Sequence, residues 1–231
     1  MRIAFLLTGF YRSFDRVKYR YEFLANYYRA DVFISTWNRD EWASNKDNYT
    51  REITKNDFED FSRHVNVEAL DIHDLDQYKI NRQSFVSNIR NNDVLKTDAR
   101  AIEHGIFWAN RLRDQWYLVN QGWNRVVHRF NYDIIFRSRL DIEVVNIPLY
   151  NAGCIVIPLD IGGWNYTDHM AFGNAASMKK YCCFYNNMQF VYDTYNVDPT
   201  HAVDFPKFYL TETEPKIAYL RDERIKYNII K

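Results

Sequence analysis

The sequence has little of what holds small extracellular proteins together. It contains 3 cysteines, 7 glycines and 5 prolines in 231 residues. The cysteines have neither the even number of a disulfide framework nor the spacing of a zinc site, so we expect free thiols in a reducing compartment. A chain of this length can bury about 70% of its unfolded surface, so its core needs no such cross-link. The cysteines are Cys154, Cys182 and Cys183.

The sequence also lacks an excess of charge of either sign. Lysine and arginine number 30, aspartate and glutamate number 30, and the pI is about 7.0. Proteins that coat nucleic acid or membrane surfaces carry a basic excess, and the sequence has no run of interleaved basic and aromatic residues. We therefore expect no nucleic-acid partner.

Long hydrophobic runs are missing as well. The apolar segment Met1–Phe10 gives way to polar residues at Tyr11 and Arg12. It is too short for a signal-peptide core with its cleavage site, or for a membrane span. Nor does an amphipathic basic helix indicate attachment to a membrane surface. We expect a soluble protein without a transmembrane segment, in the cytoplasm of the producing or host cell.

Strands and helices are predicted to alternate along the chain. Short apolar runs indicate buried strands, and apolar residues at helical spacing indicate the helices between them. With no linker and no internal repeat, the pattern predicts one α/β domain over residues 1–231, with a doubly wound, mostly parallel sheet flanked by helices. The predicted strands are Arg2–Thr8, Asp31–Thr36, Val65–Ile72, Tyr132–Arg137 and Gly153–Pro158. The predicted helices are one that begins after Ser13, a short one within the charged segment Glu41–Arg63, Thr97–Val119, Asn174–Tyr195, and a last one that begins at Thr213.

One strand end carries more charge than buried strands usually do. In the segment Tyr132–Glu143, YDIIFRSRLDIE, an apolar run leads into Arg137, Arg139 and Asp141. Such groups are costly beside a core unless they bind something, and ligands bind at the carboxyl ends of strands in open α/β sheets. Arginine matches phosphate oxygens and aspartate matches Mg²⁺ or Mn²⁺, which predicts a site for a phosphorylated ligand. A structural ladder of ion pairs on one strand face is the alternative.

Four segments together resemble the GT-A-type nucleotide-sugar glycosyltransferases, found among bacterial capsule and lipopolysaccharide enzymes and in some large DNA viruses. The resemblance implies a GT-A-like, Rossmann-like fold and transfer of a sugar from a nucleotide-diphosphate donor to a glycan acceptor. The setting it implies is synthesis of a surface or capsid glycan. The segments are Leu6–Phe14 (LLTGFYRSF), Asp31–Asn38 (DVFISTWN), Tyr132–Glu143 and Thr167–Tyr181 (TDHMAFGNAASMKKY).

The resemblance also implies a donor site. Residues at the end of the first strand would border the nucleotide diphosphate, the tryptophan after the second strand would lie near the same pocket, and the two arginines would contact the donor. These residues are Thr8, Gly9, Arg12, Trp37, Arg137 and Arg139.

A divalent metal is the cofactor that the resemblance implies. Asp141 corresponds to the last acid of the short Asp-any-Asp motif, which holds Mn²⁺ or Mg²⁺ against the diphosphate. The sequence departs from that motif, because Arg139 stands where the first acid is expected. A pair formed by Asp141 and Glu143 is the alternative metal site.

The candidate base and acceptor residues lie in the second half of the chain. Inversion at the sugar needs a carboxylate that removes the acceptor hydroxyl proton. Asp168, with His169 assisting, is the predicted base, and an ordinary turn residue is the alternative reading. Glu212 and Glu214 are second candidates and, with Trp164, predicted acceptor residues, although a helix dipole alone accounts for Glu214.

Two other functions fit the same sequence. A sugar nucleotidyltransferase uses a similar sheet but normally has a glycine-rich basic loop after the first strand, where this chain has only Gly9. A noncatalytic glycan-binding module on the same fold would tolerate the altered metal motif. Binding of sugar without turnover would distinguish this module from an enzyme.

Overall fold

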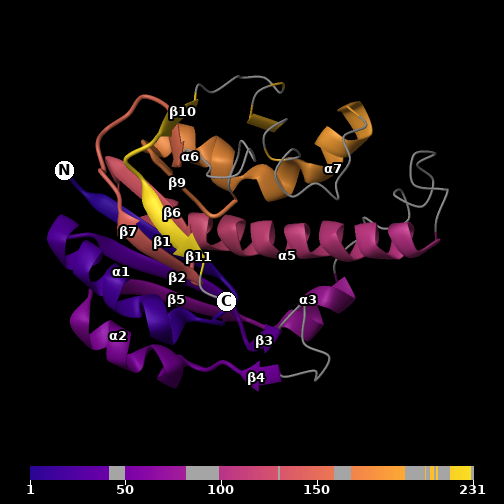
Figure 1. The fold of residues 1–231 in the computed structure, drawn as a ribbon, viewed down its shortest axis with the longest axis horizontal. Helices are drawn as coiled ribbons and strands as arrows, with labels where there is room; N and C mark the ends of the chain where they lie inside the picture. Colours follow the sequence, from indigo (N-terminus) through magenta and orange to yellow (C-terminus); the bar gives the residue numbers. More distant parts are fainter. Residues whose placement is uncertain are drawn as a thin grey trace.

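The computed structural model describes residues 1–41, 50–81, 99–129, 131–158, 168–195, 206, 209–210, 212 and 219–229. Its centre is a seven-stranded sheet that draws strands from both ends of the chain (Figure 1). In sheet order the strands are β10 (Tyr219–Asp222), β8 (Ile155–Pro158), β9 (Met170–Gly173), β6 (Ile134–Arg139), β1 (Ile3–Gly9), β2 (Asp31–Trp37) and β5 (Val67–His73).

The predicted mostly parallel sheet flanked by helices is confirmed. Strand β1 pairs in parallel with β2 on one side and with β6 on the other, β2 with β5, and β8 with β10. Strand β9 runs antiparallel to both β6 and β8. Strand order reverses between β1 and β6, because β2 and β5 extend the sheet to one side and the later strands extend it to the other.

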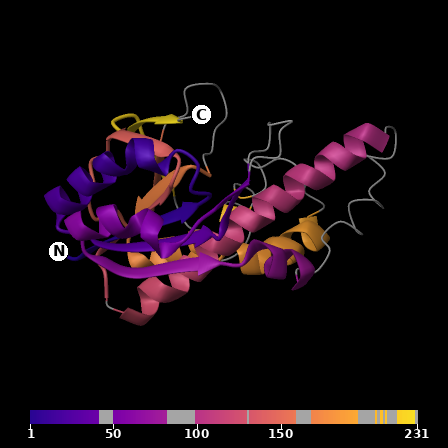
Figure 2. The ribbon, with the colours of Figure 1, turned by 90° about the horizontal axis from the view of Figure 1, so that it is seen from below.

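Helices cover both faces of the sheet (Figures 1 and 2). One face is covered by α1 (Phe14–Tyr28) and α2 (Glu59–His64), and the other by α5 (Ala99–Arg129), α6 (Ala175–Cys182) and α7 (Phe184–Tyr195). The remaining elements are the short helices η1 (Lys55–Phe58) and α3 (Leu75–Asn81) and the strand pairs β3 (Arg39–Glu41) with β4 (Thr50–Glu52) and β7 (Ile142–Asn146) with β11 (Lys226–Ile229).

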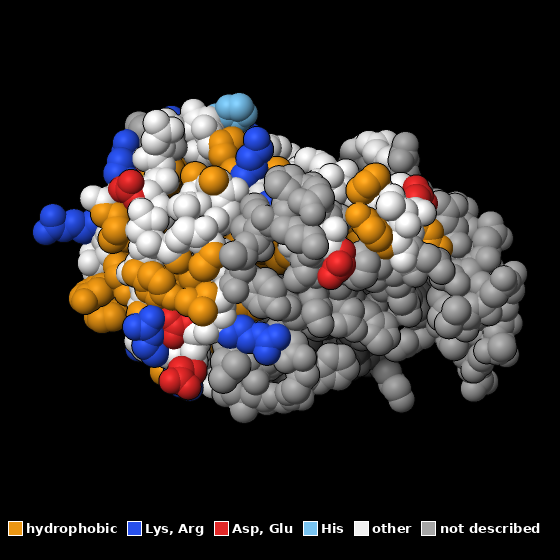
Figure 3. Space-filling model, turned by 90° about the horizontal axis from the view of Figure 1, so that it is seen from above, with side chains coloured by type: hydrophobic (Ala, Val, Ile, Leu, Met, Phe, Trp, Pro, Cys, Tyr) orange, Lys and Arg blue, Asp and Glu red, His pale blue; other side chains and the backbone are white. Residues whose placement is uncertain are grey.

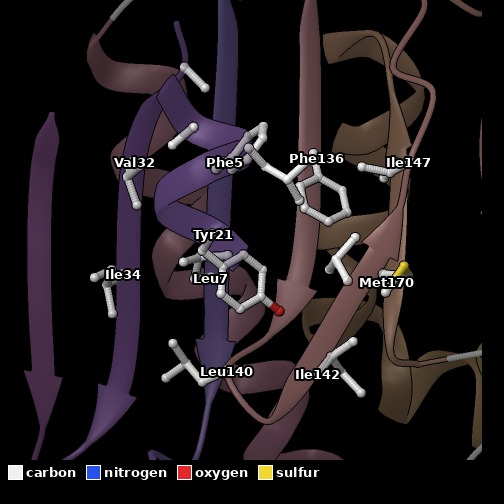
Figure 4. Packing of buried hydrophobic residues seen from close by; sticks show 14 of the residues in the cluster. Phe5, Leu7, Tyr21, Val32, Ile34, Phe136, Leu140, Ile142, Ile147 and Met170 are labelled. Atoms are coloured by element: carbon white, nitrogen blue, oxygen red, sulfur yellow. The ribbon is translucent and has the colours of Figure 1, made fainter. Parts of the chain in front are cut away.

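Successive side chains of the central strands point alternately into two hydrophobic cores, one on each face of the sheet. Phe5 and Leu7 of β1 pack with Tyr21 of α1 and Phe136 of β6, and the rings of Phe5 and Phe136 meet edge to face at 5.0 Å (Figure 4). Leu6, between them in sequence, lies in the core under α5. This alternation is what a strand buried on both faces requires.

Two predicted helices differ from those observed. The long helix continues beyond Val119 to Arg129, because Trp123 and Val126 extend its buried face along the sheet. The helix predicted after Asn174 is split into α6 and α7 at Cys183. Its predicted cap is confirmed, since the Asn174 side chain accepts a hydrogen bond of 2.9 Å from the backbone of Ser177.

Several strands are too short to stand out in the sequence. Strands β9 and β10 have four residues each, and β7 and β11 form a separate two-stranded sheet. The helix predicted to begin at Thr213 lies outside the described residues. The three cysteines are free thiols. None of the helices in the described ranges is long and apolar enough to cross a membrane.

Some large hydrophobic side chains remain on the surface. Tyr19, Phe23 and Tyr27 are 51–69% exposed along α1, where a spacing of four residues keeps them on one side of the helix. The rings of Phe23 and Tyr27 stack with centroids 6.1 Å apart. Figure 3 shows one face of the molecule, on which hydrophobic side chains gather with lysine and arginine beside them.

Close packing of α5 on the sheet depends on Gly122, and we expect Gly122→Val to destabilise the fold. An added Cβ would lie 2.4 Å from Cδ1 of the buried Leu6 and 3.2 Å from Cβ of Ser35. Overpacking of this kind costs about 1–3 kcal/mol, while valine is no worse a helix former than glycine. The free energy of unfolding in urea measures the loss.

The matched control is Gly153→Ala. Gly153 is exposed and an added Cβ would meet nothing within 4 Å. Equal stability of the Gly122→Val protein and the wild type would contradict the inferred close approach of α5 to β1.

Candidate functional site

The candidate site lies at the carboxyl ends of β1 and β6, where the strand order reverses. Thr8 is paired with Arg139 across the two strands, and the backbone N–H of Leu140 donates to the Thr8 carbonyl at 3.0 Å. In open α/β sheets this position is where ligands bind. Charged side chains from three parts of the chain meet there, and we call them the strand-end cluster: Arg12, Arg137, Arg139, Asp141, Asp168 and His169.

Asp141 is held by two arginines. Arg139 donates to it in bidentate fashion, from Nε to Oδ1 at 2.8 Å and from Nη2 to Oδ2 at 2.6 Å, and Arg12 Nη1 donates to Oδ2 at 3.1 Å. The carboxylate is only 4% exposed. Burial alone would raise the pKa of Asp141, but the charges of Arg139 and Arg12 lower it below its ordinary value. Asp141 is therefore ionised at neutral pH.

The loop after β1 bends sharply to bring Arg12 over Asp141. Gly9 has a φ of +116° and Arg12 a φ of +34°, in the left-handed region that non-glycine residues rarely adopt. Thr36 of the next strand donates its hydroxyl to the Gly9 carbonyl at 2.7 Å. Backbone strain of this kind costs about 1–3 kcal/mol and is found mainly at functional sites. The predicted residues Thr8, Gly9 and Arg12 therefore lie together at this strand end.

Arg137 lies below the site and is fully buried. Its Nε donates to Thr8 Oγ1 at 3.2 Å, and its Nη1 donates to the backbone carbonyl of Asp168 and to the hydroxyl of Tyr181. The guanidinium carbon is 5.7 Å from the centroid of the Trp116 ring. Arg137 thus connects β1, β6, α5, α6 and the segment before β9.

Asp168 and His169 form a connected pair beside these arginines. Asp168 Oδ2 accepts a hydrogen bond of 2.6 Å from Gln115 and lies 3.7 Å from Arg139, while Oδ1 is 3.4 Å from His169 Nε2. The other His169 nitrogen is 3.0 Å from the hydroxyl of Tyr227. Burial raises the pKa of Asp168, but the charge of Arg139, and that of His169 whenever it is protonated, lower it overall. Burial lowers the pKa of His169 below its ordinary value. At neutral pH the pair is a carboxylate beside a neutral imidazole.

Two predicted residues lie away from the cluster. Trp37 is fully buried and stacks on Tyr117 with ring centroids 5.5 Å apart, in a core that also contains Tyr78. Glu143 accepts hydrogen bonds from Tyr19 at 2.6 Å and Asn228 at 2.9 Å. The structure therefore does not join Glu143 to Asp141 as a pair, and Trp37 packs in the core.

The predicted acceptor residues are less fully described. Trp164 and Glu214 lie outside the described residues. Glu212 is exposed. All three stay predictions.

Gln115 and Asp40 belong to the surroundings of the site and were not predicted. Gln115 of α5 donates to both the side chain and the carbonyl of Asp168, a contact between residues 53 positions apart. Asp40 of β3 is buried, and burial raises its pKa although the backbone and charge of Arg12 oppose this. Local sequence gives no signal for contacts that depend on the packing of distant elements.

The metal ion implied by the resemblance does not fit these residues as they lie. Both oxygens of Asp141 accept hydrogen bonds from guanidinium groups, and Glu143 binds Tyr19 and Asn228 instead. Within the described ranges, no group of three or more histidine, cysteine, aspartate or glutamate side chains is placed to hold a metal.

We expect Asp141→Asn to lower the free energy of unfolding at pH 7 by about 3–5 kcal/mol, because it removes the buried negative charge that balances two arginines. The pKa of Asp141 is lowered in the folded protein. Its contribution is therefore complete above the unfolded-state pKa of about 3.9 and is lost as pH falls through the folded-state pKa.

Urea unfolding of both proteins between pH 3 and pH 7 tests this. The difference in the free energy of unfolding between the wild type and Asp141→Asn should be constant above about pH 5 and should become smaller below about pH 4. The control is Asp193→Asn, which changes an exposed aspartate of α7 bonded to Gln189. A difference that does not depend on pH would contradict the proposed role of the ion pairs.

Comparison with known proteins gives structural likenesses alone. No protein-family model and no curated protein matches the sequence. The apo-form glycosyltransferase GlyE of Streptococcus pneumoniae is 11% identical with a TM-score of 0.46, over 96% of this chain and 46% of that chain. Mouse xyloside xylosyltransferase 1 is 11% identical with a TM-score of 0.34, over 89% of this chain and 80% of that chain. This chain thus spans less than half of the GlyE chain, and such distant likenesses assign no activity to it.

Proposed function

We propose that the protein is a glycosyltransferase that moves a sugar from a nucleotide-diphosphate donor to a carbohydrate acceptor. The observation that carries this proposal is the strand-end cluster, in which guanidinium groups gather at the switch point of a mostly parallel sheet. Planar guanidinium groups match the oxygens of phosphates, and this position is where such sheets bind ligands. The resemblance in sequence extends the proposal to surface or capsid glycans.

The proposed donor site contains Arg12 and Arg139. Cleavage of a glycosyl–phosphate bond leaves negative charge on the departing diphosphate, and fixed cationic donors stabilise that charge as it develops. Both guanidinium groups are fixed in advance by Asp141. Little reorganisation would then be needed when the bond breaks.

The proposed base is Asp168, assisted by His169. Asp168 is ionised, and Gln115 and Arg139 fix its carboxylate beside the arginines of the donor site. His169 lies between Asp168 and Tyr227 as a neutral imidazole that can accept a proton. Removal of the acceptor hydroxyl proton by such a group is what an inverting transfer requires.

A noncatalytic glycan-binding module is the second candidate. The observation that favours it is that both oxygens of Asp141 and both oxygens of Asp168 already have partners. In such a module the cluster would be structural, and sugar would bind without turnover.

A thermal-shift screen of UDP-, GDP-, dTDP- and CMP-sugars tests the donor proposal. A diphosphate donor at about one hundred times its dissociation constant should raise the melting temperature by about 5–10 °C. The CMP-sugar, with one phosphate, should give a smaller shift. Arg139→Gln should reduce the shift to about half or less, because it removes a phosphate-binding group and so weakens binding.

The matched control for this screen is Arg125→Gln. Arg125 also makes a bidentate pair, with Asp71, but lies exposed on α5. A shift of the same size in Arg139→Gln as in the wild type would contradict the proposed donor site. The absence of a shift with every donor would favour the glycan-binding module.

Asp168→Asn tests the proposed base. We expect kcat to fall about 10²–10⁴-fold, because asparagine cannot accept the proton, while the dissociation constant of the donor changes little. Initial-rate kinetics together with donor titration separate these two effects. The control is Asp133→Asn, an exposed aspartate directly before β6. Unchanged kcat in Asp168→Asn would exclude Asp168 as the base.

A further inference from the structure

Each arginine of the strand-end cluster has N–H groups that are not paired with an acceptor in the described part of the structure. A guanidinium has five N–H donors and no acceptor. The Nε of Arg12 and the Nη2 of Arg137 are buried atoms with no hydrogen-bond partner. The Nη1 of Arg139 is 3.7 Å from the nearest oxygen of Asp168, beyond a normal hydrogen bond. Buried donors without acceptors are rare, so a ligand rich in acceptor oxygens is the chemistry that would complete them.

Asp141 has the opposite property, because its oxygens are already engaged. Arg139 Nε donates to Oδ1, and both Arg139 Nη2 and Arg12 Nη1 donate to Oδ2. A divalent cation bound by Asp141 would displace these bonds and would lie beside two guanidinium groups of like charge. Such a cation would therefore lose the favourable field that metal sites normally provide.

Arg139 stands at the position where the metal motif would have its first acid. On β6 it replaces a negative side chain with a positive one, and it contacts Asp141 rather than a cation. A guanidinium carries its charge permanently and binds phosphate in a planar, bidentate manner. The cluster therefore already contains the positive charge that a metal would supply to a diphosphate.

We propose that Arg12 and Arg139 bind the diphosphate of the donor directly, with no divalent cation between the diphosphate and the protein. Asp141 is then a positioning residue that fixes both guanidinium groups. This inference rests on the proposed glycosyltransferase function.

The transfer step needs no further reagent under this inference. The bond between the anomeric carbon and the phosphate oxygen breaks, and its electron pair stays on the departing diphosphate, which Arg12 and Arg139 stabilise. The acceptor hydroxyl oxygen forms the new bond to the anomeric carbon. Its proton passes to Asp168.

The test is calorimetric titration of the protein with UDP, GDP, CDP and dTDP, each in EDTA and again with MnCl₂. We expect one of these nucleotides to bind with dissociation constants that agree within about twofold in the two conditions. Arg12→Gln and Arg139→Gln should each weaken that binding about 10- to 100-fold in EDTA, since each removes charge-assisted hydrogen bonds. Arg125→Gln is the control and should leave it unchanged.

Asp141→Asn provides a separate readout. Asparagine keeps a carbonyl oxygen for the arginines but loses the charge that a metal ligand needs. Under the inference this variant still binds the nucleotide in EDTA, and MnCl₂ has no effect on its affinity. If the variant is not folded by circular dichroism, Arg12→Gln decides the question, because Arg12 lies on a surface loop and contributes to no strand or helix.

The outcomes separate this inference from the proposed function. Binding that requires MnCl₂ would overturn the inference and leave the glycosyltransferase proposal in place. Binding in EDTA that neither arginine variant weakens would also overturn the inference. No binding of any nucleotide in either condition would overturn both.

Discussion

The parallel pairing of β1 with β6 is the constraint on which the rest of the molecule depends. Strand β1 is hydrogen-bonded on both sides and buried on both faces, and its register with β6 sets Thr8 opposite Arg139. The same register puts Arg137 beneath the strand end, where its guanidinium bonds to Thr8. Because buried polar groups need partners, the pairing that stabilises the sheet also fixes the arginines of the site. Stability and site geometry therefore come from one set of contacts.

The charges of the cluster are supplied by elements that lie far apart in sequence. Asp141 is held by a loop that follows β1, and Asp168 is held by Gln115 from the long helix across the other face of the sheet. Neither carboxylate could be buried at reasonable cost without these partners. The site can therefore form only when the loop after β1 has folded over the strand end and α5 has packed on the sheet. This arrangement links the packing of α5 on the sheet to the placement of a few charged atoms.

The sequence was sufficient for the main strands and for the charged strand end, because both signals are local. Apolar runs identify β1, β2 and β6, and Arg139 and Asp141 stand out as charges beside such a run. The chain turns at Leu140–Asp141, which breaks the alternation of a strand, and Glu143 bonds to Tyr19 and Asn228. The pairing of Asp141 with Glu143 at a metal stays a prediction. The environment of Trp37 could not be predicted from the sequence. A tryptophan at the end of a strand gives the same sequence pattern whether it stacks on Tyr117 in the core or lines a pocket.

The antiparallel direction of β9 determines which of its flanking residues lie at the site. In a parallel strand, only the residues that follow it reach the carboxyl edge of the sheet. Because β9 runs the other way, the residues that precede it reach that edge, and the backbone N–H of Arg139 donates to the His169 carbonyl at 3.0 Å. A slip of one residue in this pairing would move Asp168 or His169 into the place of the other and would turn the side chains of β9 to the opposite face. The register of β9 therefore decides which side chains lie at the site. An insertion or deletion near β9 would change the residues of the site more than many substitutions would.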